Sequence, residues 1–282
     1  MTPAESTDDC EAEGAGDPNE DPGLTVGQLA ERDTLLRIFP RLPVATAAIV
    51  GPGDDAAVLA APDGRYVVTT DMMVHGPDFR FAWSTFHDLG WKAAATNLSD
   101  VAAMGARPTA LVVAIATPKA TTVLQLQDLA DGLREACEAL APGCGVVGGD
   151  LSVSATFTIA VTAFGDLEGR APVLRSGARP GDVVAVSGEL GTAGAGLRML
   201  FERGVDQSGE PDPSRAAALR ATHSPQVEAQ LAPRPPIADG AAAAIAGATA
   251  MLDLSDGLAR DARRIAEASS CLLYTSPSPR DS

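Results

Sequence analysis

Six short aspartate-bearing motifs, spread along most of the 282 residues, constrain this chain more than any other feature of its sequence. They are Gly53-Asp54-Asp55, Thr69-Thr70-Asp71, Asn97-Leu98-Ser99-Asp100, Gly148-Gly149-Asp150, Asp253-Leu254-Ser255 and Asp256-Gly257. Each ends an apolar strand-like run or lies in or beside an alanine-rich helical segment. One aspartate beside glycine is usually a turn residue, but this repetition indicates a fold that gathers carboxylates.

Carboxylates that lie close together repel one another, so each resists ionisation unless a cation lies between them. Mg²⁺ prefers such oxygen ligands and commonly completes its coordination shell with the phosphates of a substrate. The motifs therefore predict metal-assisted phosphoryl transfer from a nucleotide. Catalysis by histidine has no support, because His75, His87 and His223 have neither metal-ligand spacing nor a paired nucleophile.

The N-terminal motifs also have ordinary structural explanations. Asp54 and Asp55 could belong to a simple Gly-Pro-Gly turn, and Asp71 could end a strand and cap a helix. Asp100 is harder to explain in this way, because an aspartate inside a helix is neither a good helix former nor a cap. Asn97 lies three residues earlier on the same helix face. We therefore favour a polar site on this face over a solvent-exposed one.

Glycines precede two candidate phosphate-binding segments. Small residues at 148 and 149 would let the backbone approach a phosphate while Asp150 reaches a metal, although a Gly-Gly-Asp turn alone is weak evidence. The glycine-rich segment 188–196 could cradle a phosphate ahead of a helix, but it matches no standard phosphate-binding motif. Close packing of neighbouring elements explains this second segment equally well.

The last motif offers several polar groups where a strand is expected to give way to a helix. A helix N-cap accounts for only one of Asp253, Ser255 and Asp256, so a binding site is the better interpretation. Arg175 lies in a glycine-containing approach to the second half of the chain. Its fork of donors would suit a phosphate, and a surface ion pair explains it equally well.

Composition and charge restrict the partners and the cellular location of a protein with such a site. Half of the net charge of −16 comes from eight acids in residues 1–23, a segment without Lys or Arg that we expect to be disordered. The acidity that remains argues against nucleic acid as a partner. No apolar stretch approaches the roughly 20 residues of a membrane span. Four cysteines without a C-x-x-C pair, and no secretory signal, favour a cytoplasmic protein.

Periodicity and turn residues predict an α/β fold. The hydrophobic fraction is 45% but the aromatic fraction only 4%, which favours closely packed layers of small side chains. We expect helices at 24–42, 84–105, 121–140, 237–250 and 258–268, and strands at 65–70, 111–115, 155–164, 183–187 and 248–252. A linker near residue 170 separates two units.

Taken in order, the motifs resemble those of thiamine-monophosphate kinase. The matching segments are Gly53-Asp-Asp-Ala-Ala57, Thr70-Asp71, Asn97-Leu-Ser-Asp-Val-Ala-Ala-Met-Gly-Ala-Arg-Pro108, Gly148-Gly-Asp150, Arg175-Ser-Gly-Ala178 and Leu252-Asp-Leu-Ser-Asp-Gly257. This family shares its fold with aminoimidazole ribonucleotide synthetase, selenophosphate synthetase and a hydrogenase maturation factor. The resemblance implies two α/β domains, the first a mixed sheet packed with helices that forms a barrel across a homodimer interface.

The resemblance also implies a reaction and the residues that serve it. ATP would phosphorylate thiamine phosphate to thiamine diphosphate by direct in-line transfer, with ATP bound near the homodimer interface. The implied Mg²⁺ ligands are Asp55, Thr69, Thr70, Asp71, Asp100, Asp150, Asp253 and Asp256. The implied ATP contacts are Gly149, Asp150, Arg175 and Ser255. Because the acceptor is itself an ionised phosphate, no general base is required.

The expected organisation follows from this alignment. Residues 1–23 form an acidic tail, 24–170 the N-terminal ATP- and Mg²⁺-binding domain, and 171–268 part of a C-terminal domain. Residues 269–282 contain Ser-Pro-Ser-Pro, which continues no helix or strand. We expect this last segment not to be native and the C-terminal domain to be truncated.

Three further points complete the expectations. Asp78 stands where many members of the family carry a substrate-contacting histidine, so it is assigned to the thiamine phosphate site. Another ATP-dependent enzyme of the same fold is a rival, but segment 148–150 lacks the Gly-Gly-Glu pattern of aminoimidazole ribonucleotide synthetase. Cys10 lies in the acidic tail, not in the glycine-rich loop of a selenophosphate synthetase. An inactive fragment that binds ATP and Mg²⁺ is the second rival.

Overall fold

A computed structural model describes residues 23–52 and 56–273, so the motif that holds Asp54 and Asp55 lies outside the described residues. The first half of the chain contains α1 (Glu31–Ile38), η1 (Phe39–Arg41), β1 (Ala48–Val50), β2 (Val58–Leu59), β3 (Val67–Val74), α2 (Phe86–Ala103), β4 (Arg107–Thr117), α3 (Val123–Leu140), β5 (Gly145–Val153) and β6 (Thr158–Asp166). The second half contains η2 (Arg175–Gly177), α4 (Thr192–Arg203), α5 (Pro213–Thr222), α6 (Ser224–Leu231), α7 (Ile237–Ile245) and α8 (Leu258–Ala268).

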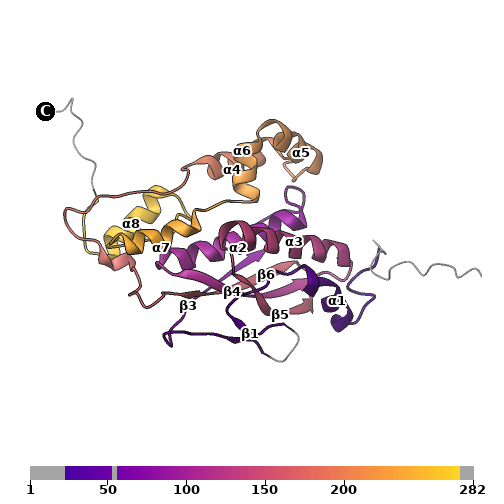
Figure 1. The fold of residues 1–282 in the computed structure, drawn as a ribbon. Helices are drawn as coiled ribbons and strands as arrows, with labels where there is room; N and C mark the ends of the chain where they lie inside the picture. Colours follow the sequence, from indigo (N-terminus) through magenta and orange to yellow (C-terminus); the bar gives the residue numbers. More distant parts are fainter. Residues whose placement is uncertain (1–22, 53–55, 274–282) are drawn as a thin grey trace, which may run out of the picture.

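A mixed four-stranded sheet, in the order β3-β6-β4-β5, forms the centre of the first half (Figure 1). β6 is antiparallel to both of its neighbours, whereas β4 and β5 are parallel and joined through α3. The register places Asp71 opposite Val161, Val161 opposite Val113, and Val113 opposite Gly149. β3 and β5 are therefore the two edges of this sheet.

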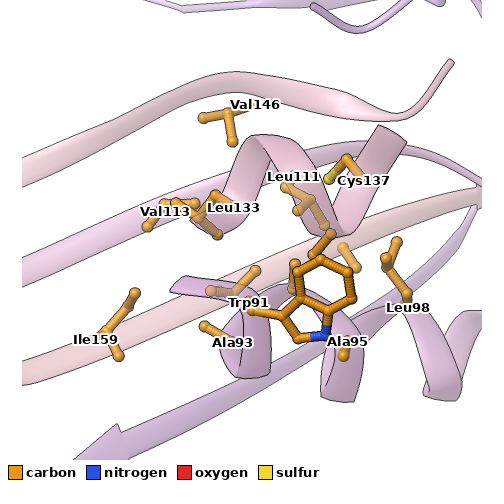
Figure 2. Close-up of a cluster of buried hydrophobic side chains, with 14 of the residues drawn as sticks. Trp91, Ala93, Ala95, Leu98, Leu111, Val113, Leu133, Cys137, Val146 and Ile159 are labelled. Carbon is orange, nitrogen blue, oxygen red and sulfur yellow. The ribbon is translucent and has the colours of Figure 1, made fainter. Parts of the chain in front are cut away.

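Helices α2 and α3 cover one face of the sheet and bury most of the apolar side chains between the layers (Figure 1). Figure 2 shows this core, where Leu98 and Trp91 of α2 and Leu133 of α3 lie with Leu111 and Ile159 of the sheet. The side chains alternate along β6, so that one face of the strand is buried and the other is partly exposed. The buried cysteines Cys137 and Cys144 are free thiols.

Two glycines allow α2 and α3 to approach each other closely. A Cβ added at Gly90 would lie 2.0 Å from the Leu129 carbonyl oxygen, and one added at Gly132 would lie 2.1 Å from the His87 carbonyl oxygen. Backbone atoms cannot move aside as a flexible side chain can, so no larger residue fits at either position. This contact fixes α2 over the sheet and thereby fixes where its polar side chains lie.

The opposite face of the sheet has no helix over it and remains partly open among the described residues. The antiparallel pair of β1 and β2 covers one part of this face, near Val112 and Phe164. Val68 and Met72 of β3 lie on this face and are 56% and 61% exposed. Two large apolar side chains this exposed on an open sheet face favour a surface that another molecule covers.

The second half of the chain docks on α2 through polar anchors. Both tryptophans lie in the first half and donate to second-half carbonyls: Trp83 Nε1 to Gly204 at 2.8 Å, and Trp91 Nε1 to Pro233 at 2.6 Å. Arg220 of α5 forms a bidentate pair with buried Asp88, at 2.7 and 2.8 Å. Trp83 also packs into the apolar cluster of α4, α5 and α6.

The expected mixed α/β fold is confirmed, with two corrections. Residues 183–187 and 248–252 are not strands, and none of the described residues after Asp166 belongs to one. A strand needs a neighbour for its backbone groups, and none is present here: Val183 is 91% exposed. Helices α5 and α6 were not expected in this region.

The other expected elements are present: the helices are as long as expected or shorter, whereas β3, β4 and β6 extend beyond the strands expected at 65–70, 111–115 and 155–164. The helix expected over 24–42 is limited to α1 and η1, because Pro40 and Pro43 close the run. Segment 188–196 leads into α4, where a Cβ at Gly196 would lie 2.0 Å from the Gln226 carbonyl oxygen, so close packing accounts for at least that glycine. No helix in the described ranges is long and apolar enough to cross a bilayer.

The close contact between α2 and α3 gives a first prediction. Gly90→Ala should lower the free energy of unfolding by at least about 2 kcal/mol, because the methyl group overlaps backbone atoms. The matched control is Gly194→Ala on α4, where nothing lies within 4 Å of the added Cβ. Urea unfolding of both variants should show a loss for Gly90→Ala and no loss for Gly194→Ala; equal effects would contradict the packing argument.

Candidate active site

The site begins where α2 crosses β3. Thr69 Oγ1 donates a hydrogen bond to Asp100 Oδ2 at 2.9 Å, and the Asp71 amide donates to Asn97 Oδ1 at 3.2 Å. Later residues of the strand therefore meet earlier residues of the helix, so α2 and β3 run in opposite directions. Asp71 and Asp100 both lie along this crossing.

The side chain of Asn97 links the helix to the strand and has no free end with which to bind a metal or substrate. Its side chain is 1% exposed, and its Nδ2 donates to the Ala93 carbonyl at 2.9 Å while its Oδ1 holds the Asp71 amide. Both ends of the amide are therefore occupied by backbone groups. Asn97 fixes the strand against the helix and so positions Asp71.

Two groups from the second half of the chain join the crossing. Burial raises the pKa of Asp100 to about 6; the Thr69 hydrogen bond and the Arg175 charge oppose this rise, whereas Asp253 and Asp71 add to it. Burial also raises the pKa of Asp253, against the opposing effect of Arg175 and with the support of Asp71. Three carboxylates and one guanidinium thus share one electrostatic neighbourhood, which we call the aspartate cluster: Asp71, Asp100, Asp253 and Arg175.

Packing between η2 and the end of α8 helps to hold Arg175 in this position. Ser269 Oγ donates to the Arg175 carbonyl at 2.8 Å and accepts from the Ala178 amide at 3.1 Å. A Cβ at Gly177 would lie 1.9 Å from the Thr249 carbonyl oxygen, so η2 also lies directly against the segment before Asp253. The Val173 amide donates to Met104 at the end of α2, which ties this assembly to the helix that carries Asp100.

Thr70 and Asp150 lie on the other face of the sheet. Thr70 is opposite Thr162, and Asp150 is opposite Ala114, so the alternation along each strand points both side chains to the helix-free face. Thr70 Oγ1 donates to the Val161 carbonyl at 3.0 Å, and exposed Asp150 accepts from Ser152 Oγ at 2.9 Å.

Asp150 is thus separated from the aspartate cluster within one chain. β3 and β5 are three strand spacings apart, which corresponds to roughly 14 Å. Asp71 faces the helices and Asp150 faces away from them. Within a single chain, Asp71, Asp100 and Asp253 therefore share one electrostatic neighbourhood, and Asp150 lies apart from it.

The remaining expected residues have other partners or stand apart. Asp256 Oδ2 accepts from Arg264 at 2.5 Å, and the Asp256 amide donates to Asp261 Oδ2 at 3.0 Å. Ser255 is exposed, beside the cluster in sequence. Asp78 accepts from the Val74 amide at 2.7 Å in the turn after β3. Asp55 lies outside the described residues.

Sequence reasoning missed one buried carboxylate near the site. Asp261 is 0% exposed in the first turn of α8, where it accepts from the Asp256 amide and from Arg264 Nη1 at 2.8 Å. Its charge also contributes to the raised pKa of Asp253. An acid in the first turn of a helix is the only signal in the sequence that could have identified it.

The side chains of the described residues do not form a complete metal-binding site. No three His, Cys, Asp or Glu side chains in the ranges 23–52 and 56–273 lie close enough together to hold an ion. Burial nevertheless raises the pKa of Asp100 to about 6, and the charges of Asp253 and Asp71 add to this rise. The donor set of carboxylates and a threonine hydroxyl is the one that suits Mg²⁺.

A separate cavity of about 590 Å³ lies beside Gly149 and Asp150. Leu35 and Phe39, Leu126 and Leu129 on α3, and Ile115 of β4 give it mostly apolar walls. An apolar cavity with a glycine backbone and one carboxylate at its edge is the usual form of a small-molecule site.

Two family models match this chain. Residues 53–167 match the N-terminal domain of AIR synthase related protein, and residues 179–276 match its C-terminal domain. The mixed sheet with its helical face and the aspartate cluster therefore belong to a two-domain AIR synthase related protein.

Individual relatives narrow this class. The thiamine-monophosphate kinase of Mycobacterium tuberculosis (strain H37Rv) is 49% identical over 245 residues, which are 87% of this chain and 68% of that protein. The enzyme of the same name from Corynebacterium glutamicum is 41% identical over 247 residues, covering 86% of this chain and 69% of the relative.

Solved structures agree with these relatives. A thiamine-monophosphate kinase from Stenotrophomonas maltophilia K279a superimposes with a TM-score of 0.70 at 31% identity, covering 86% of this chain and 73% of that one. A structure described as AaThiL complexed with AMPPCP and TMP gives a TM-score of 0.61 at 32% identity, covering 77% and 64%. The chain belongs to the thiamine-monophosphate kinase family, and it spans about two thirds of the length of these relatives.

The raised pKa of Asp100 gives a prediction about stability. A carboxyl that titrates near 3.9 when unfolded and near 6 when folded binds its proton more tightly in the native state. Ionisation therefore opposes folding, so stability should fall as pH rises from about 4 to about 6 and stay low above that. Asp100→Asn should remove this fall and gain on the order of 2 kcal/mol over wild type at pH 7.

The measurement is urea unfolding across this pH range in the presence of a chelator, so that bound cations do not contribute. Asp63→Asn serves as a control of opposite sign, because hydrogen bonds from Arg65 lower the pKa of Asp63. An Asp100→Asn variant whose stability follows the wild-type pH curve would contradict the electrostatic argument.

Proposed function

We propose that this chain phosphorylates thiamine phosphate to thiamine diphosphate with ATP, by direct in-line transfer at the aspartate cluster, with Mg²⁺ held by these carboxylates. The observation that carries the proposal is the convergence of Asp71, Asp100 and Asp253 with Arg175. Burial raises the pKa of Asp100 to about 6, Asp253 and Asp71 add to that rise, and Arg175 opposes it. Membership of the thiamine-monophosphate kinase family supports the choice of acceptor. The structure described as a complex with AMPPCP and TMP supports both substrates.

Each residue of the cluster has a role in this proposal. Asp71, Asp100 and Asp253 would hold Mg²⁺ with the hydroxyl of Thr69, and Asp55 and Asp256 would add ligands. Mg²⁺ held by these residues would supply positive charge to neutralise the two phosphates. Thr69 fixes one oxygen of Asp100, Asn97 positions Asp71, and the guanidinium of Arg175 presents a planar fork to ATP phosphate, with Ser255 beside it.

The proposed transfer does not require a side chain that acts as a general base. The acceptor is a phosphate monoester, which is largely ionised near neutral pH, so no side chain has to remove a proton from it. The protein must align the acceptor phosphate with the terminal phosphate of ATP and compensate the negative charge of both. A half-buried cluster of fixed carboxylates that binds cations meets both needs.

We also propose that the active protein is a homodimer through the helix-free face of the N-terminal sheet. Exposed Val68 and Met72 on this face support this, as do the two sheet edges, β3 and β5, that are unpaired within the described chain. A two-fold axis that brings β5 of one copy beside β3 of the other would carry Asp150 and Thr70 of the two copies together. Asp150 of the second copy would then lie beside Thr70, on the strand that carries Asp71.

The cavity beside Gly149 and Asp150 fits the same arrangement. Its apolar walls suit a purine base, and its polar edge at Asp150 would lead the nucleotide's phosphates toward the cluster of the other copy. In this arrangement one ATP molecule could contact Gly149 and Asp150 of one copy and Arg175 and Ser255 of the other copy. A cytoplasmic location accompanies this proposal, because ATP is a cytoplasmic substrate.

The central role of Asp100 gives a prediction about activity. Asp100→Asn should lower kcat at least about 100-fold while leaving the circular dichroism spectrum unchanged, because the amide cannot compensate the charge of a cation. Release of ADP with thiamine phosphate as acceptor is the measurement, and Asp63→Asn is the control on the surface. Activity close to wild type in Asp100→Asn would refute the proposed ligand role.

The same assay separates the rival functions. A wild-type chain that transfers phosphate only to another acceptor points to a different enzyme of this fold. One that binds ATP in calorimetry without any turnover is a binding fragment.

The shared site predicts complementation between two inactive variants. Asp100→Asn and Asp150→Asn, mixed 1:1 and allowed to exchange subunits, should recover about a quarter of wild-type activity. The reason is that half of the dimers are mixed and each mixed dimer keeps one intact site of two. Asp100→Asn mixed with Asp253→Asn is the matched control and should recover nothing, since every site then carries one substitution. No recovery in the first mixture, with dimers present, would refute the shared site.

A further inference from the structure

Arg264 of α8 pairs with two carboxylates, one on either side of the point where that helix begins. Its Nη2 lies 2.5 Å from Asp256 Oδ2, and its Nη1 lies 2.8 Å from Asp261 Oδ1. Asp256 precedes the helix, and Asp261 lies in its first turn. We call these three side chains the Arg264 bridge. The proposed transfer gives Arg264 no role.

An ordinary helix-surface ion pair explains only part of this bridge. Arg264 and Asp261 are three residues apart on α8, a spacing at which opposite charges stabilise a helix slightly. Asp261, however, is 0% exposed, so it is not a surface partner. Arg264 also reaches beyond the helix to Asp256. The bridge therefore ties the preceding segment to the helix.

The segment that carries Asp253 and Asp256 has few other attachments. Within the described ranges, the Asp256 amide is the one amide between residues 251 and 257 that has a hydrogen-bond acceptor, and this acceptor is Asp261 Oδ2 at 3.0 Å. The side chain of Asp256 is held by Arg264. Both the backbone and the side chain of Asp256 are thus fixed by the Arg264 bridge.

The bridge occupies only one oxygen of Asp256. Oδ2 accepts from Arg264, whereas Oδ1 has no hydrogen-bond partner among the residues that the structure describes. The side chain of Asp256 is 40% exposed, so a cation can reach it. Carboxylates that bind a metal are usually hydrogen-bonded themselves, and those partners orient them. Asp256 has this form: one oxygen is held and the other is available.

α8 also connects the bridge to the aspartate cluster. At the end of the helix, Ser269 Oγ donates to the Arg175 carbonyl at 2.8 Å. At its beginning, the charge of buried Asp261 acts on Asp253. The helix therefore fixes Asp256 beside two members of the cluster.

We propose that Arg264 is a positioning residue for Mg²⁺, which holds Asp256 by Oδ2 and leaves Oδ1 for the cation, while buried Asp261 keeps the guanidinium in place. This inference rests on the proposed function, which assumes Mg²⁺ at the aspartate cluster with Asp256 as an added ligand. The role requires an arginine, because its planar fork presents separate nitrogens to two carboxylates.

Arg264→Lys and Arg264→Gln separate positioning from charge. Lysine keeps the positive charge without the fork, and glutamine removes the charge. If Arg264 positions Asp256, both variants should raise the dissociation constant for the cation roughly 10- to 100-fold, the usual effect of removing a partner of a metal ligand. If only its charge mattered, Arg264→Lys would bind like wild type and Arg264→Gln more tightly, because like charges repel.

Mn²⁺ is the probe, because it takes the same oxygen ligands as Mg²⁺, and electron paramagnetic resonance measures the free ion. The full chain is titrated without nucleotide. Arg263→Gln is the matched control at the next position of α8, where Arg263 pairs with Glu267 at 2.6 Å. It should bind Mn²⁺ within about twofold of wild type. Urea unfolding in a chelator checks the fold, and Arg264→Lys decides the question if Arg264→Gln does not fold.

A double-variant cycle tests whether Arg264 acts through Asp256. Asp256→Asn should weaken Mn²⁺ binding, and adding Arg264→Lys to it should change the dissociation constant less than about twofold. A purely structural role would lower stability in chelator and leave the affinity of the folded chain unchanged.

The outcomes separate this inference from the proposed function. A wild-type chain that binds neither Mn²⁺ nor Mg²⁺ overturns both the inference and the metal role of the cluster. If wild type binds Mn²⁺, three results overturn only the inference: unchanged or tighter binding in Arg264→Lys, unchanged binding in Asp256→Asn, or an effect of Arg264→Lys that persists in full in the double variant.

Discussion

The structure depends on holding several carboxylates together in a partly dry place. Asp100 sits on a helix whose other side is fully committed to the core, and it cannot move away from Asp71 and Asp253 without unpacking that helix. The repulsion among these groups is therefore built in and not relaxed. A cation bound between them would lower their energy, so the arrangement favours the binding of a cation at this place.

α2 connects the core, the site and the second half of the chain. Its apolar side packs on the sheet, and Gly90 lets it approach α3 at backbone distance. Trp91 and the nearby Trp83 anchor the second half through carbonyl groups, and Asp88 does so through Arg220. These anchors are buried and directional, which explains why Arg175 and Asp253, so far along the chain, lie beside Asp100.

Several parts of this arrangement could be predicted from the sequence. The polar face of α2 was visible because Asn97 and Asp100 interrupt an apolar helix at helical spacing, and Asp71 because it follows a β-rich run. The strands expected at 183–187 and 248–252 had the right composition, but their neighbours are not in the described structure. The role of Asn97 as a clamp and the burial of Asp261 depend on contacts with distant backbone groups, which local sequence does not encode.

By itself, the sequence indicated which residues are candidates for the chemistry and, for Asp71 and Asp100, on which strand or helix they lie, since periodicity and turn residues act over a few positions. Only the tertiary structure decided which of these residues meet. Asp71 and Asp150 end similar runs, yet the strand order puts them on opposite edges and the register on opposite faces of the sheet. The physical reason is that a one-residue change of register reverses every side chain, and register is fixed by packing between segments far apart in the chain.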